Sequence, residues 1–252
     1  MDTLTPTKPV KINRWLPYWA VLQADVRLTV RSWIYRTWVL VTVLAVVGYL
    51  IYHVGIYQGA GIVQQASKLI GDLLRWTMLG SITLIIALTA GCISSERGTM
   101  ADSVLSRGIS RYQYFMGKWH ARLATVMFTF LTMGAATLLA SYLLLHEDMK
   151  FLGCLVALVT VAALLLAIVS GGVMVSAIVN STALGVAIMM LAVYGSWLAM
   201  SFLPTYFPSP NLAYTLKGYY DLQLVSRLAG WSACASLVMA IIGLLYFARR
   251  DV

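Results

Sequence analysis

Long apolar segments alternate with short polar ones along the chain. Five stretches carry no Asp, Glu, Lys or Arg: Arg36 to Lys68, Arg75 to Glu96, Arg122 to Glu147, Lys150 to Lys217 and Arg227 to Arg249. A helix needs about 20 apolar residues to cross a bilayer, so four of these stretches fit one span each. The stretch over 151–216 is too long for one span. Asn180-Ser181 divides it, and Pro204, Pro208 and Pro210 interrupt the helical pattern beyond the second half.

The pattern therefore predicts an all-α membrane protein with six transmembrane helices. The spans are expected near 37–57, 76–94, 123–145, 151–179, 182–203 and 229–248. Residues 1–36 form an N-terminal segment before a transmembrane domain over 37–252. None of the six predicted spans contains a charged side chain.

Composition agrees with a bilayer as the solvent of this chain. Of its 252 residues, 60% are hydrophobic and only 11% are charged, whereas globular domains average roughly 45–50% and 25%. The net charge of +9 would suit nucleic acid, but the basic residues cluster at the ends of apolar runs, so no nucleic-acid partner is expected. With both termini in the cytoplasm, 13 of the 18 basic residues lie inside and 5 outside, which is the positive-inside pattern.

An amphipathic helix is predicted immediately before the first span. The apolar residues Trp19, Leu22, Val26, Val30 and Trp33 recur at helical spacing, and Gln23, Arg27 and Arg31 occupy another face. Such a helix lies in the cytoplasmic interface, with its arginines toward lipid phosphates. It can serve as a lipid anchor or as a lever that runs into the first span.

The sequence lacks the groups that several membrane functions need. The absence of charged residues in the predicted spans disfavours an ion-coupled carrier, which keeps ionisable groups at mid-membrane. Ser196 has no His or carboxylate in a neighbouring span to activate it as a nucleophile. Gly117-Lys118 fails as a phosphate-binding loop, because Tyr112 and Trp119 stand where Gly and Ser or Thr are required. We expect no catalytic, cofactor or metal site on this chain.

The polar loop between the second and third predicted spans has helix signals of its own. Thr99 and Asp102 fit an N-terminal cap, and the short helix Met100–Arg107 would stop at Gly108. Ser110 with Gln113 then predicts a capping box that opens the next helix. The alternative is a solvated loop with incidental caps. In the fourth span, Ala163, Ala167 and Gly171 recur every four residues, a pattern for close helix packing.

The chain resembles the type-2 permeases of ATP-binding-cassette (ABC) transporters. The resemblance rests on Ser94-Ser95-Glu96-Arg97-Gly98-Thr99, Leu105-Ser106-Arg107-Gly108-Ile109-Ser110-Arg111, Gly117-Lys118 and the ending Tyr246-Phe247-Ala248-Arg249-Arg250-Asp251. These residues look like the family's loop between its second and third spans and its C-terminus. Residues 204–228 are similar to the family's re-entrant or extracellular segment before the last span.

The resemblance implies a half-transporter in a plasma (bacterial inner) membrane. Two permease subunits, identical or homologous, would pair above two ATPase subunits that hold ATP and Mg²⁺. Met100–Arg107 would be the coupling helix and Asn180-Ser181 a second ATPase contact. Glu96 is assigned to orienting the loop through Arg97 or Arg111. The implied coupling residues are Glu96, Arg97, Thr99, Met100, Asp102, Leu105, Arg107, Arg111, Asn180 and Ser181.

The family does not fix the cargo, although an amphipathic or lipid-like molecule is one candidate. Two other functions stay open at this point. One is a non-transporting scaffold or assembly factor driven by an ABC ATPase. The other is an ion-coupled carrier or an integral membrane enzyme.

Overall fold

The computed structural model describes residues 15–60, 65–96, 109–145, 148–202 and 211–249. Within these ranges the chain forms eight α helices and one 3₁₀ turn. Their bounds are α1 Leu16–Arg31, α2 Trp33–Ala60, α3 Ala66–Ala90, η1 Ser94–Glu96, α5 Arg111–Leu145, α6 Phe151–Ile178, α7 Thr182–Phe202, α8 Leu212–Leu216 and α9 Leu222–Arg249.

Six of these helices, α2, α3, α5, α6, α7 and α9, are long and apolar enough to cross a membrane. The all-α fold and the predicted number of spans are therefore confirmed, and the chain is a multi-pass membrane protein. Several helices extend past the predicted span ends, which had been set at the nearest charged residue. Consequently Asp72 and Arg75 lie in α3, Lys118 and Arg122 in α5, and Arg227 in α9.

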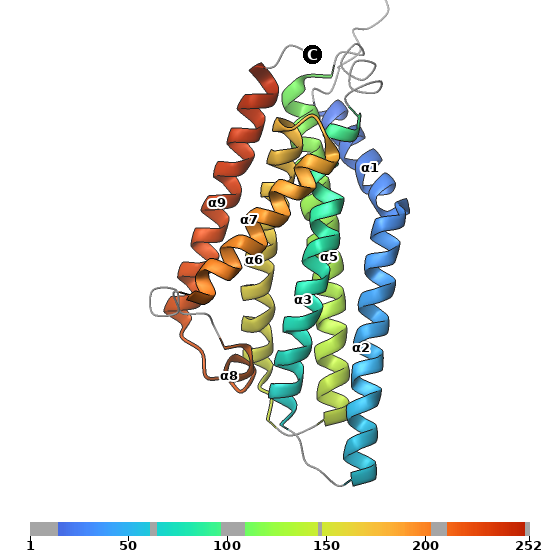
Figure 1. Ribbon diagram of the computed structural model, residues 1–252, viewed down its shortest axis with the longest axis vertical. Helices are drawn as coiled ribbons and strands as arrows, with labels where there is room; N and C mark the ends of the chain where they lie inside the picture. The colour runs from blue at the N-terminus through green and yellow to red at the C-terminus, as the bar shows by residue number, and fades with distance from the viewer. Residues whose placement is uncertain (1–14, 61–64, 97–108, 146–147, 203–210, 250–252) are drawn as a thin grey trace, which may run out of the picture.

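α6 is the central helix of the bundle. It contacts α3, α5, α7, α8 and α9, and it packs most extensively against α9. Figure 1 shows α7 running obliquely across α6, while α2 stands at the opposite edge of the bundle. Small residues make these close approaches possible: Gly172 lies against Thr89 of α3, and Gly243 of α9 lies against Phe115 of α5.

The predicted row of small residues on α6 is only partly enclosed. Gly171 is buried, and a Cβ at this position would meet Met189 of α7 and Met239 of α9. Ala163 and Ala167 are half-buried. The row thus contributes to packing within the subunit at its Gly171 end.

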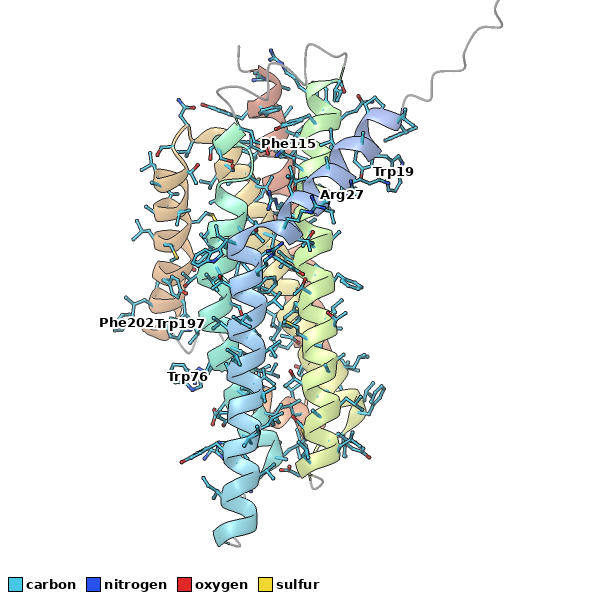
Figure 2. All side chains as sticks on the ribbon, turned by 90° about the vertical axis from the view of Figure 1, so that its right-hand side faces the viewer. Trp19, Arg27, Trp76, Phe115, Trp197 and Phe202 are labelled. Atoms are coloured by element: carbon cyan, nitrogen blue, oxygen red, sulfur yellow. The ribbon has the colours of Figure 1, made fainter. Side chains whose placement is uncertain are left out.

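One end of the bundle carries α1, η1 and the last turn of α9, and we call it the α1 end (Figure 1). Ser32 separates α1 from α2: its extended backbone ends α1, and its hydroxyl accepts the Tyr35 N–H at 3.2 Å in the first turn of α2. α1 then crosses α5 obliquely (Figure 2). Val21 lies so close to Gly117 that a Cβ there would meet the Val21 side chain at 2.9 Å.

The face of α1 that packs on the protein is not its apolar face. Val21, Asp25 and Thr29 are buried against the bundle, whereas on the apolar stripe Trp19 and Val30 are 54% and 43% exposed and Leu22 and Val26 are only half-buried. Figure 2 shows Trp19 pointing away from the helices. In a membrane, large apolar groups can face lipid at no cost, so the buried side of a helix is free to be polar.

The opposite end, called the α8 end, is closed by the short helix α8. Its N-cap Asn211 accepts the Ala213 N–H at 3.1 Å, and Gly218 follows the helix with a φ of +89° that favours glycine. The helix fits against two neighbours: Ala213 contacts Gly71 of α3, and the carbonyls of Thr215 and Leu216 contact Gly153 of α6.

A carboxylate fastens this end. Asp148, between α5 and α6, accepts hydrogen bonds from the backbone N–H and the hydroxyl of Ser67 at 3.1 and 2.7 Å. Its Oδ2 is also 3.3 Å from Nζ of Lys217, which donates to Gln65 at 2.9 Å. We call Asp148, Ser67, Lys217 and Gln65 the α8-end clasp. It joins the start of α3 to the segment after α8.

The α8-end clasp should depend on pH. Partial burial opposes ionisation of Asp148, but hydrogen bonds from Ser67 and the charge of Lys217 outweigh it and hold the pKa of Asp148 below its usual value. The clasp therefore stabilises the fold above the unfolded-state pKa of about 4, and this contribution is lost as pH falls through the lower folded-state pKa. Asp148→Asn should cost about 1–2 kcal/mol at pH 7, since the group is partly exposed.

The measurement is thermal unfolding of both proteins in lipid nanodiscs across pH. The gap in thermal midpoint between wild type and Asp148→Asn should be constant from pH 7 to 5 and should close under stronger acid. A gap that does not narrow at all between pH 5 and pH 3 would show that the carboxylate charge does not hold the clasp.

Candidate functional site: a buried charge cluster at the α1 end

The start of α5 is fixed by the predicted capping box. The Ser110 backbone N–H donates to the Gln113 side chain, and the Gln113 N–H donates to the Ser110 hydroxyl, each at 3.2 Å. These reciprocal bonds satisfy donors that the first turn of a helix leaves free. From this start, Tyr114, Lys118 and Arg122 follow at intervals of four and share one face of α5.

Asp25 of α1 lies over this face and is 3% exposed. Its Oδ1 accepts from Nη2 of Arg122 at 3.2 Å and from Nζ of Lys118 at 3.3 Å. Nε of Arg122 is 3.0 Å from Oδ2, close enough for an ion pair but not aligned for a hydrogen bond. One carboxylate thus joins α1 to two successive turns of α5.

Lys118 also links α5 to η1. Its ammonium lies 2.6 Å from Oε1 of Glu96 and donates to the carbonyl of Cys92 at 2.9 Å. The hydroxyl of Tyr114 donates to Oε2 of Glu96 at 2.7 Å. Glu96, which the sequence analysis assigned to orienting the loop, is therefore held by Lys118 and Tyr114.

The four ionisable groups form a paired unit that we call the charge cluster: Asp25, Glu96, Lys118 and Arg122. The formal charges of its two acidic and two basic side chains sum to zero. Lys118 and Arg122 are 3% and 8% exposed, so they have lost nearly all their hydration. Removing one partner from such a group leaves an uncompensated buried charge, which is far more costly than the net gain of the pairing.

Hydroxyl groups fasten the same turn to two further helices. Ser176 of α6 accepts the backbone N–H groups of Ile93 and Ser94 at 2.8 and 3.0 Å, which follow the end of α3. The Ser94 hydroxyl lies 3.1 Å from that of Thr182, the first residue of α7. The turn Ile93–Glu96 is thereby bound directly to α5, α6 and α7, and Lys118 links it to Asp25 of α1.

The end of α9 completes the site. Arg111 donates to the carbonyl of Ala248 at 3.2 Å, and Phe247 stacks on Tyr114 with ring centroids 5.8 Å apart. Phe115, labelled in Figure 2, is fully buried between α5 and α9. Both sides of the loop between α3 and α5 are therefore anchored on packed helices.

Only some of the predicted coupling residues fall in the described ranges. Glu96 and Arg111 flank the loop, and Asn180 and Ser181 are exposed beside Thr182, next to the Ser94 contact. The structure thus brings the exit of α3 close to the α6–α7 connection. Six further residues lie outside the described ranges: Arg97, Thr99, Met100, Asp102, Leu105 and Arg107.

Sequence reasoning missed Asp25, Tyr114, Lys118 and Arg122 as members of one site. A signal was present in the spacing. Asp25 stands four residues from both Val21 and Thr29, and Tyr114, Lys118 and Arg122 are also four residues apart. The contact between the two helices is a tertiary one, and the spacing within each helix does not show that these two polar faces pack against each other. The arrangement ties α1, η1 and α5 to one another.

No protein-family model matches the chain, and no curated protein is significantly similar to it.

Proposed function

We propose that this chain is the membrane-spanning permease subunit of an ATP-driven transporter of the ABC type-2 class. The observation that carries the proposal is the direct attachment of the turn Ile93–Glu96 to α5, α6 and α7, with Lys118 extending the connection to Asp25 of α1. A force applied to the loop that follows Glu96 would reach α1, α5, α6 and α7 without passing through flexible chain. The loop motifs that resemble the family's coupling segment stand directly after this turn.

In this proposal the α1 end is cytoplasmic, in agreement with the basic residues, and ATP and Mg²⁺ bind to separate ATPase subunits. Two permease subunits, identical or homologous, would form the complex in the plasma membrane. An amphipathic or lipid-like molecule is one candidate for the cargo. The charge cluster does not favour an ion-coupled carrier, because its charges pair with one another at one end of the bundle.

The test is Leu105→Asp in the complex purified from its native membrane. We expect this change to abolish co-purification of a nucleotide-hydrolysing partner, because burying Leu105 in a groove would contribute about 1.5–3 kcal/mol. Leu105→Met is the matched control, since it keeps an apolar side chain of similar size. Both variants should insert normally, because the site lies outside the spans.

If Leu105→Asp retains its partner and its ATP-dependent activity, this loop is not the docking element. Loss of the partner would also establish the orientation, since a soluble ATPase can reach only the cytoplasmic side. A partner that binds and hydrolyses ATP without any cargo-dependent stimulation in liposomes would instead favour the scaffold or assembly-factor alternative.

A further inference from the structure

A cavity of about 40 Å³ lies between α2, α3 and α5, away from the charge cluster. This volume is the space open to the centres of water molecules, and a single water needs roughly 10–15 Å³ of it. The cavity can thus hold about three waters. Its walls mix apolar side chains with hydroxyl groups, among them Trp38, Thr42, Thr77, Ser81, Met133 and Thr137.

Trp38 supplies an unsatisfied donor to this cavity. Its side chain is 3% exposed, and its ring is held edge-on against Tyr35, whose hydroxyl bonds to Thr129 at 2.8 Å. The indole Nε1 has no hydrogen-bond partner among the described residues. An indole N–H only donates, so its burial without an acceptor carries the full cost of desolvation.

Two hydroxyls that line the cavity, those of Thr77 and Thr137, are left as acceptors. Thr77 donates its proton to the carbonyl of Leu73 at 2.7 Å, and Thr137 donates to that of Met133 at 2.8 Å. Each keeps lone pairs for one more bond. The cavity is thus lined by a residue of α2 with an unpaired donor and by hydroxyls of α3 and α5 with free lone pairs. Water, which both accepts and donates, fits this arrangement.

We infer that ordered water occupies this cavity and links Nε1 of Trp38 to the hydroxyls of α3 and α5. The site is a small hydrated pocket within the apolar bundle. It requires no partner protein and no bound substrate, so it stands independently of the proposed transport function.

Radiolytic hydroxyl-radical labelling tests this, because radicals formed from bound water oxidise side chains beside it. The protein in lipid nanodiscs would be irradiated and its methionines analysed by mass spectrometry. Met78 and Met133 line the cavity. Met127 is the matched control: it lies on α5 like Met133 and is also half-buried, but it does not line the cavity. We expect Met133 and Met78 to be oxidised severalfold faster than Met127.

Trp38→Phe keeps the ring and removes the donor, so it should reduce the oxidation of Met133 toward that of Met127 and lower the thermal midpoint. Equal rates for Met133, Met78 and Met127 in the wild type would overturn the inference, whatever the variant does. A rise in the midpoint of Trp38→Phe would also overturn it, because removing a donor from a dry cavity relieves an unpaired group.

Discussion

Replacing Asp25 with alanine should destabilise the protein by about 3–5 kcal/mol, the usual cost of leaving a buried charge without its partner. Arg122 and Lys118 both point at this carboxylate. Lys118 keeps Glu96 as a partner, but the buried Arg122 loses the carboxylate with which it pairs. We expect α1 to separate from α5, which thermal unfolding in nanodiscs and proteolysis after Arg27 or Arg31 would both detect.

The double variant Asp25→Ala with Arg122→Ala is the decisive comparison. Removing both members of the pair eliminates the uncompensated charge, so the double variant should be more stable than Asp25→Ala alone, despite its larger loss of side chain. If the two effects simply add, Asp25 and Arg122 do not act as a pair. Gln23→Ala, at an exposed position of α1, should be close to neutral.

Gly153→Ala is expected to be nearly as severe, at about 3 kcal/mol. An added Cβ would collide with the carbonyl of Thr215 and approach that of Leu216 to 2.8 Å. Both are backbone atoms of α8, so no side chain can rotate away, and the cost falls at the upper end of the range for overpacking. The substitution should displace α8 from α6 and lower the thermal midpoint.

Gly230→Ala provides the control, because nothing lies within 4 Å of a Cβ there. In the interior of α9 this change should be neutral or slightly stabilising, since alanine favours helix over glycine. Equal midpoints for the two variants would mean that α8 does not rest on Gly153. A labelled cysteine at Lys217 would report whether the segment after α8 has moved.

The helical fold follows from features that are local in sequence. Apolar runs of sufficient length predict spans, and Ser110 with Gln113 predicts the start of α5, because both depend on neighbours along the chain. Span ends were less predictable. Arg75 and Arg122 were taken as limits, yet α3 begins at Ala66 and α5 at Arg111, since a buried partner or the bundle end accommodates each charge.

The candidate site was predictable only in part. Glu96 was assigned an orienting role, but its partners Lys118 and Tyr114 depend on how η1 folds back over α5. Asp25 lies 93 residues before Lys118 in the chain, and nothing local predicts that contact. The apolar stripe of α1 also drew attention away from Asp25, because in a soluble protein that stripe, and not its polar neighbour, would face the core.

The balance of the charge cluster has an electrical consequence. Each elementary charge that crosses a membrane potential of 100 mV involves work of roughly 2.3 kcal/mol. With all four side chains ionised, Asp25, Glu96, Lys118 and Arg122 sum to zero, so a displacement that carries them together does no such work. The cluster therefore adds no voltage dependence of its own to a movement of α1 and α5 as one unit. A substitution that neutralises Asp25 would add one uncompensated positive charge to that movement and would make it more sensitive to voltage.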